Sequence, residues 1–283
     1  MASPFDIITV RNLEVNTAFR DILLQNGLET FESFMRHAHV EIVKQAVAER
    51  STVKLMLRDG RGESTFFLKR HTSPRLREYL KLLTRFSRPK SAFNEWQAII
   101  RFHEMKLPTM VPVAAGEKKG RFGIVNQSFV LTEEIKDAKR LDHYLEKWNE
   151  NPLSPEQIKR KRELIDRLAM ITRRMHSSGL NHRDYYLCHV FLREKNQEKD
   201  FELFVLDLHR VDIRHKVGQR WVVKDLAALN YSSLGLPIHA TDRIRFLKAY
   251  LQKDRLDEKD HRLLRQVLRK TRKIAGHAKK KRI

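Results

Sequence analysis

The segment HRDYYLCHVFL, residues 182–192, determines how the rest of the chain is interpreted. It follows a predicted helix that ends at Gly179, and it leads into a short apolar strand at Leu187–Leu192. A second short apolar strand is predicted over Phe201–Leu208, and Asp207 lies near its end. The segment therefore places a His-Arg-Asp triplet on a loop before a strand pair, with a further carboxylate at the end of that pair.

The chain before residue 135 has a mainly extended pattern. The turn Asp59-Gly60 lies between two β-rich runs, and Asp-Gly favours a hairpin because glycine adopts positive φ at little cost. We expect an antiparallel sheet of five strands, with one long helix after the third strand that Ser91 would cap. The predicted strands begin near Val40 and then cover 52–57, 64–69, 111–116 and 126–134, with helices over 74–86 and 91–105.

The chain after residue 135 is mainly helical. Ser154-Pro155-Glu156-Gln157 has a serine cap, a proline in the first turn and an acid, all typical of a helix start. Strands followed by helices indicate an α+β fold with two lobes. We therefore predict an N-terminal extension over 1–39, an ATP-binding N-lobe over 40–135, a catalytic C-lobe over 136–268 and a disordered basic tail over 269–283.

Four residues follow one another along the chain in an order similar to that of the catalytic residues of protein-kinase-like enzymes. Lys69 ends the third strand, where it would reach nucleotide phosphates, and Glu95 in the next helix would pair with it. Asp184 would accept the proton of the acceptor hydroxyl, and Asp207 would hold Mg²⁺. The backbone of Thr132–Ile135, including Glu133 and Ile135, would contact the adenine of ATP. Each residue alone is a weak signal, and the order and element types together carry the prediction.

Longer motifs resemble one family more closely. This resemblance, to the lipopolysaccharide core heptose kinase family (WaaP/RfaP type), implies ATP-dependent phosphorylation of a heptose hydroxyl in the lipopolysaccharide inner core. It also implies a cytoplasmic protein that is peripheral on the cytoplasmic face of the inner membrane of a Gram-negative bacterium. It makes Asp225 a structural brace of the catalytic loop. The motifs are NEWQA at 94–98, TEE at 132–134, NHRDYYLCH at 181–189, LDLHR at 206–210, RW at 220–221 and KDLAAL at 224–229.

Departures from the ordinary protein kinase pattern favour a small-molecule or glycolipid kinase. Tyr186 stands where many protein kinases have lysine, and His189 stands where they have the second metal-binding asparagine. We therefore group His189 and Arg183 with Asp184 as catalytic residues, and His189 with Asp207 as metal ligands. An imidazole is a poorer ligand for Mg²⁺ than an amide oxygen, so His189 would hydrogen-bond Asp184 or phosphate, or favour Mn²⁺.

The charge of the chain predicts an anionic partner. Its 283 residues carry 57 Lys and Arg against 35 Asp and Glu, a net charge of +22. Seven basic residues lie within Arg70–Lys90, where leucines at helical spacing suggest a helix on an anionic membrane or on the glycolipid, or else a charged surface helix. An acidic protein partner is a further possibility. A single cysteine, Cys188, fits a reducing compartment, and no apolar run is long enough to span a bilayer.

Other functions remain open at this stage. Within the kinases, the acceptor could be another core sugar or a protein tyrosine. From a different class, a basic nucleic-acid-binding protein would explain the charge, but it would leave the ordered kinase residues as coincidence, and no specific nucleic-acid motif is present. Trp96 and Trp221 are interpreted as packing residues.

Overall fold

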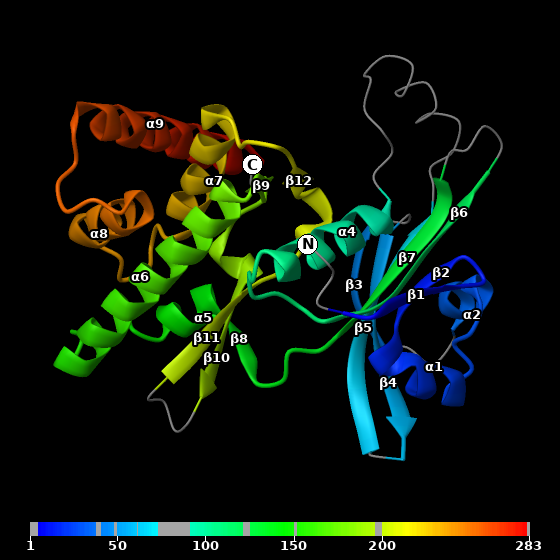
Figure 1. Ribbon diagram of the computed structural model, residues 1–283. Coiled ribbons are helices and arrows are strands. Elements are labelled where there is room, and N and C mark those ends of the chain that lie inside the picture. Colours follow the sequence, from blue (N-terminus) through cyan, green and yellow to red (C-terminus); the bar gives the residue numbers. More distant parts are fainter. Residues whose placement is uncertain are drawn as a thin grey trace. The chain divides into compact units, whose positions relative to one another are not determined.

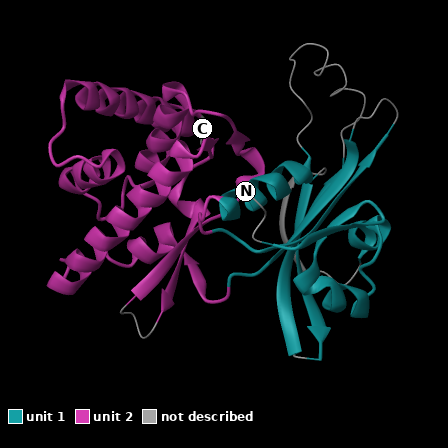
Figure 2. Cartoon of the chain, in the orientation of Figure 1, with its two compact units in different colours: residues 1–104, 109–135 teal, residues 105–108, 136–283 magenta. Residues whose placement is uncertain are grey.

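The computed structural model describes residues 5–37, 41–47 (backbone), 50–60, 62–72, 91–120, 125–149, 152–195 and 200–281. The chain divides into two compact units (Figure 2). No helix within the described ranges has both the length and the apolar character needed to cross a membrane. Unit 1 comprises residues 1–104 and 109–135, and unit 2 comprises 105–108 and 136–283.

Unit 1 is built on one antiparallel sheet of seven strands (Figure 1). Its order is β1-β2-β6-β7-β5-β4-β3, so the long hairpin of β4 and β5 lies beside β7 near the centre. The turn of this hairpin pairs Asp59 with Gly62, as the Asp-Gly signal predicts. The strands are β1 (Ile7–Val10), β2 (Leu13–Asn16), β3 (Glu41–Val47), β4 (Arg50–Asp59), β5 (Gly62–Thr72), β6 (Pro112–Lys119) and β7 (Val125–Glu133).

The two faces of the sheet pack against different helices, because side chains alternate along each strand. One face, which includes the buried Phe66, Leu68 and Phe129, shares a core with residues of α1 (Arg20–Gln25) and α2 (Phe31–Arg36). The other face meets α4 (Ala92–Glu104), where the Ser128 hydroxyl accepts a hydrogen bond from the Ala92 amide at 2.9 Å. The Ser91 hydroxyl accepts from the Phe93 amide at 2.9 Å, which confirms the predicted cap of this helix.

The expectation of an extension before the sheet is corrected by the structure. Residues 7–16 form β1 and β2, and β2 pairs with β6 through Leu13↔Gly116 and its neighbours. The sheet therefore has seven strands where the sequence predicted five. The four-residue strands β1 and β2 give too few alternating positions to stand out in the sequence, and it is the core contacts of Leu13 and Val15 that place them.

Unit 2 contains the long helix α6 (Pro155–Ser177), whose start the sequence predicts. The Ser154 hydroxyl accepts from the Gln157 amide, and the Gln157 side chain accepts from the Ser154 amide, which completes a capping box. Gly179 ends the helix with φ +79°, and an added Cβ there would lie 1.9 Å from the Arg214 carbonyl oxygen. The other helices are α5 (Leu141–Glu146), α7 (Gln219–Ser232), α8 (Ala240–Leu251) and α9 (Glu258–Lys281).

The predicted disordered tail is also corrected. Helix α9 continues to Lys281, so most of the basic segment after residue 269 is helical (Figure 1). Val267 is buried in a core with Leu226 and Tyr250, and the Thr271 hydroxyl is bonded to Asn230 of α7 at 3.0 Å. One apolar stripe that packs against α7 is enough to hold a helix whose other faces are charged.

Short strands and single helical turns carry the loop of residues 182–189. β10 pairs with β11 and with β8, and β9 pairs with β12, so each end of the loop is fixed by a strand. These elements are β8 (Ala138–Arg140), β9 (Leu180–Asn181), β10 (Val190–Lys195), β11 (Asp200–Val205) and β12 (Asp212–Ile213), with 3₁₀ turns η3 (Leu187–His189) and η4 (Leu208–Arg210).

Candidate active site

Lys69 and Glu95 form an ion pair in unit 1. Lys69 is on β5 and Glu95 is in the first turn of α4, and the Lys69 Nζ lies 2.6 Å from Glu95 Oε1. The Glu95 side chain is fully buried, whereas that of Lys69 is 23% exposed. A buried carboxylate needs a cation, so the pair fixes the lysine ammonium while leaving it accessible on one side.

The segment predicted to contact adenine ends the last strand of unit 1. The Glu133 amide donates to the Val111 carbonyl at 3.1 Å, and the Glu134 amide donates to the Thr65 carbonyl at 3.0 Å. Both amides are therefore used by the protein itself. The contact of Glu133 and Ile135 with adenine stays a prediction.

In unit 2, Asp225 holds the loop that carries Asp184. Asp225 lies on α7 and is fully buried, and its two carboxylate oxygens accept hydrogen bonds from the amides of His182 and Arg183 at 2.7 and 2.8 Å. These are the contacts expected of a residue that braces the loop. Hydrogen bonds from backbone amides to a carboxylate are among the stronger ones in proteins, so the loop backbone is firmly positioned.

The Asp184 carboxylate is paired with Arg210. The Arg210 Nη1 lies 2.9 Å from Oδ1 and 2.7 Å from Oδ2 of Asp184. Arg210 comes from η4, which directly follows Asp207. The arginine therefore links the predicted base to the segment that contains the predicted metal ligand.

Asp207 lies between two imidazoles. His209 Nδ1 donates to Asp207 Oδ1 at 2.6 Å, and His189 Nε2 lies 3.4 Å from Asp207 Oδ2. Asp207 has φ +61° and ψ +55°, and Arg183 in the loop has φ +71°. Left-handed backbone at residues other than glycine is strained and is found often at functional sites.

His189 connects the two aspartates. Its Nδ1 lies 2.8 Å from the Asp184 carbonyl oxygen, and because a carbonyl only accepts, Nδ1 carries the proton. Nε2 then faces Asp207 either as a lone pair or, in the imidazolium, as a second N–H. Burial lowers the pKa of His189, but the hydrogen bonds with Cys188 and the Asp184 carbonyl and the charge of Asp207 outweigh it, so the net pKa is raised.

The Arg183 side chain contacts residues of β12 and α7. Its Nη1 donates to Asp212 Oδ1 at 3.2 Å, and its guanidinium carbon lies 5.2 Å from the centre of the Trp221 ring. The Arg183 side chain is thus held by β12 and α7. Its backbone amide donates to Asp225 and so belongs to the braced loop that carries Asp184. The catalytic assignment of Arg183 stays a prediction.

Asp207 and His189 offer donor atoms that fit a divalent metal ion in part. Mg²⁺ takes oxygen ligands and is usually held by one or two carboxylates together with waters and substrate phosphates. Asp207 offers such a carboxylate, and His189 Nε2 is the neighbouring donor. Within the described residues, no three His, Cys, Asp or Glu side chains are grouped so as to hold a metal ion by themselves.

Part of the predicted basic stretch lies outside the described residues. Residues 73–90, with the expected helix and its leucine stripe, are not described, nor are Ala48 and Glu49 of the first hairpin turn. Arg70 is described, and its guanidinium donates to the carbonyls of Phe34 and His37 at 2.8 and 3.0 Å. It therefore holds the end of α2, which is a structural function within unit 1.

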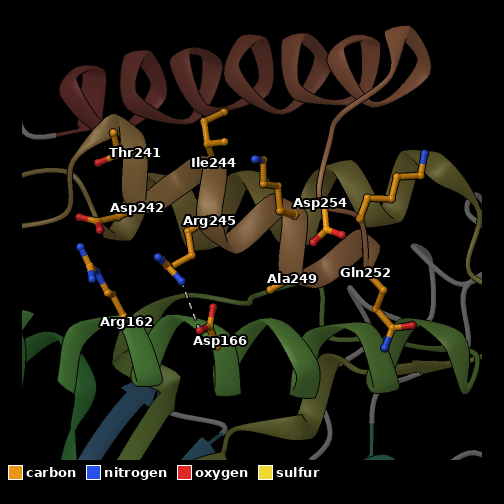
Figure 3. Close-up of a pocket in the computed structure, with 11 residues that line it drawn as sticks. Arg162, Asp166, Thr241, Asp242, Ile244, Arg245, Ala249, Gln252 and Asp254 are labelled. Carbon is orange, nitrogen blue, oxygen red and sulfur yellow. Dashed lines mark ion pairs between the residues drawn. The ribbon is translucent and has the colours of Figure 1, made fainter. Parts of the chain in front are cut away.

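Two cavities of unit 2 are separate from this chemistry. The larger, about 580 Å³, lies between α6 and α8 and is polar, with Arg245 paired to Asp166 at 3.6 Å across it (Figure 3). The other, about 320 Å³, is lined mainly by leucines and other apolar side chains of α5 to α9, including Leu145, Leu168 and Leu229. Neither is lined by Asp184 or Asp207.

Comparison with known proteins identifies the family. The model of the lipopolysaccharide kinase (Kdo/WaaP) family matches residues 32–250. The chain belongs to this family. It is 34% identical over 256 residues to the lipopolysaccharide core heptose(I) kinase WaaP of Escherichia coli, covering 89% of this chain and 93% of that one. It is 36% identical over 252 residues to the WaaP of Pseudomonas aeruginosa, covering 87% and 86%.

A solved structure of WaaP in complex with acyl carrier protein has the same fold. It matches with a TM-score of 0.72 at 31% identity, over 92% of this chain and 98% of that chain. The predicted α+β, protein-kinase-like fold and the predicted family are therefore confirmed. As a member of a lipopolysaccharide kinase family, the chain is a phosphotransferase that uses ATP and acts on a sugar hydroxyl.

Arg210 is the main residue of the site in this family member that sequence reasoning missed. The motif LDLHR ends in Arg210, three residues after the predicted metal ligand Asp207. This spacing does not predict which carboxylate the arginine pairs with. Only the fold brings η4 back to the loop, so that this guanidinium meets Asp184. The sequence showed that Arg210 belongs to a motif, but it did not show that Arg210 contacts Asp184.

Proposed function

We propose that this chain transfers the γ-phosphoryl group of ATP to a heptose hydroxyl of the lipopolysaccharide inner core. Two relatives named as core heptose(I) kinases cover most of the chain at 34–36% identity, and this supports heptose as the acceptor. The ion pair between Lys69 and the buried Glu95 carries the proposal, because phosphoryl transfer in protein kinases requires this pair to position the nucleotide phosphates.

Each residue then has a distinct task. Asp184 accepts the proton of the sugar hydroxyl as that oxygen attacks the γ-phosphorus, and Arg210 orients the Asp184 carboxylate. Lys69 contacts the nucleotide phosphates, and Asp207, with His189 beside it, would hold Mg²⁺ or Mn²⁺. When bound, the metal ion neutralises charge on the phosphate oxygens. Asp225 keeps the loop backbone in place and does not touch the reacting atoms.

The test is transfer by the purified full-length chain to defined acceptors. Core lipopolysaccharide that lacks the heptose phosphate, an acceptor that ends before heptose, and a tyrosine-containing peptide are incubated with ATP and either Mg²⁺ or Mn²⁺. Mass spectrometry of the core oligosaccharide should show one added phosphate on heptose in the first reaction alone. Phosphate on another core sugar, or on the peptide with no heptose product, would overturn the proposed acceptor.

We also propose an acyl carrier protein as a partner. The solved relative was determined with acyl carrier protein, and the net charge of +22 on this chain suits an acidic partner. The apolar cavity of about 320 Å³ in unit 2 has the chemistry to accept an acyl chain. Co-purification with acylated but not with unacylated carrier would support this, and equal binding of both would contradict the use of the cavity.

We propose that the protein acts at the cytoplasmic face of the inner membrane. The acceptor is a lipid-linked glycan, and the chain's positive charge favours an anionic lipid surface. Flotation with vesicles of anionic lipid, at low and high salt, tests this. We expect binding at low salt that falls as salt rises, and no flotation under either condition would contradict it.

A further inference from the structure

Trp221 is surrounded by positive charge. The indole ring, on the first half of α7, has four cationic groups within 6 Å of its centre. Because all four lie so close to one point, no two are more than about 11 Å apart. The groups are Arg183 at 5.2 Å, Arg214 at 5.3 Å, Arg220 at 5.2 Å and Lys224 at 5.7 Å.

The acids near this cluster do not balance its charge. Asp212 accepts from Arg183 at 3.2 Å and from Arg214 at 3.0 Å, so one carboxylate serves two cations. In the part of the chain that is described, Arg220 and Lys224 have no carboxylate within ion-pair distance, and the buried Nε of Arg183 has no hydrogen-bond partner. Charges at separations comparable with the screening length of about 8 Å at physiological salt repel one another, so the cluster favours an added anion.

The cluster is next to the proposed base. Arg183 directly precedes Asp184, and the electrostatic environment of Lys224 includes Asp184 and Arg210. Burial lowers the pKa of Lys224, and the charges of Arg210 and Arg183 lower it further, while those of Asp184 and Asp225 raise it. Arg214 and Arg220 are exposed, so their guanidinium groups can reach a ligand from solvent.

We propose that the four cations around Trp221 bind an anionic group of the acceptor glycolipid, a sugar carboxylate or a phosphate close to the phosphorylated hydroxyl. This rests on the proposed function, and it assigns the recognition of the acceptor to α7 and the segment after β12. Arginine matches both carboxylate and phosphate through paired N–H groups, and the indole face keeps the guanidinium groups in place. Trp221 is then a platform for cations and more than a packing residue.

Binding of the acceptor without nucleotide tests the proposal. Delipidated core oligosaccharide is titrated into the full-length wild type, into Arg220→Gln and into Arg214→Gln/Arg220→Gln, with Arg245→Gln in α8 as a matched control. Two altered oligosaccharides, one with its carboxylates reduced to alcohols and one with its phosphates removed, identify the anion. The same proteins are assayed for the KM of acceptor and of ATP, and their melting temperatures establish that they are folded.

We expect about tenfold weaker oligosaccharide binding and a similarly raised acceptor KM in the double variant, a smaller effect in Arg220→Gln and none in Arg245→Gln. The KM for ATP and kcat at saturating acceptor should change little. The wild type should lose affinity for one altered oligosaccharide, and the double variant should not discriminate against it. Wild-type affinity in the folded double variant overturns this inference alone. A wild type that neither binds nor phosphorylates the core overturns the proposed function instead.

Discussion

The Arg210 guanidinium lies against the Asp184 carboxylate, with Nη1 2.9 and 2.7 Å from the two carboxylate oxygens. The loop backbone around Asp184 is braced separately, by the bonds from His182 and Arg183 to Asp225. Two contacts therefore fix the proposed base: one holds its backbone and the other its side chain. Such double support is what a general base needs, because proton transfer is steeply dependent on geometry.

Changing Arg210 to Gln should lower kcat by about tenfold to a hundredfold, because the Asp184 carboxylate would lose its orientation. The dissociation constant for ATP should change less than threefold. Steady-state kinetics and nucleotide titration measure the two. Arg193→Gln is the matched control, since Arg193 pairs with Glu202 on the β10–β11 hairpin at 2.5 Å, and a folded Arg210→Gln protein with the kcat of that control would contradict the assignment.

Asp184→Asn and Asp207→Ala should both remove most activity, but in different ways. Loss of a general base costs about 10²–10⁴ in rate while nucleotide still binds. Loss of the metal ligand should also weaken the binding of ATP in the presence of Mg²⁺, because the metal bridges protein and phosphates. Titration of ATP with and without Mg²⁺ separates them: metal-dependent affinity should persist in the first variant and disappear in the second.

His189→Ala should lose at least about tenfold in activity, because its Nδ1–H holds the Asp184 carbonyl and its Nε2 faces Asp207. Asparagine at this position can supply the oxygen ligand that protein kinases use. We therefore expect His189→Asn to recover part of the activity in Mg²⁺. Unchanged kcat of the alanine variant in both Mg²⁺ and Mn²⁺ would mean that His189 is structural.

Lys161→Met should destabilise unit 2 by about 3–5 kcal/mol, because it leaves Asp242 as a buried charge without its partner. The Lys161 Nζ lies 2.8 Å from Asp242 Oδ2, and both side chains are at most 10% exposed. Adding Asp242→Asn should restore part of the loss, since the asparagine still caps α8. Urea denaturation of the wild type, the single variant and the double variant measures this, and a single variant as stable as the wild type would refute it.

Acid should destabilise unit 1 through His103. Burial lowers its pKa below the ordinary value of 6.5, against the raising effect of the hydrogen bond to the Met110 carbonyl. As the pH falls through 6.5 the unfolded chain takes up a proton that the folded chain does not, so stability is lost toward acid. The melting temperature of His103→Gln should therefore fall less than that of the wild type between pH 7.5 and 5.5. Equal falls would contradict this.

The sequence alone was enough for the local features and for the family. The β-rich runs on either side of Asp59-Gly60 predicted the β4–β5 hairpin, and the Ser154 cap with Gly179 predicted α6, because these signals act through neighbouring residues. The order of the catalytic residues predicted a kinase, because catalytic groups must occur in a fixed order on fixed elements, and the resemblance of the motifs from residue 94 to residue 229 pointed to the lipopolysaccharide kinases. Net charge indicated an anionic partner but not the place where it binds.

Tertiary structure decided everything that depends on contacts between segments distant in the chain. It placed residues 7–16 in the sheet, because β6 offers an edge on which Leu13 and Val15 can be buried. It made α9 a helix to residue 281 by packing its apolar stripe against α7. It brought Arg210 to Asp184 and set four cations around Trp221, because the turn after β11 and the first half of α7 return to one loop. The sequence shows which charged residues are present, but folding sets the distances between them, and these distances determine whether they form a site.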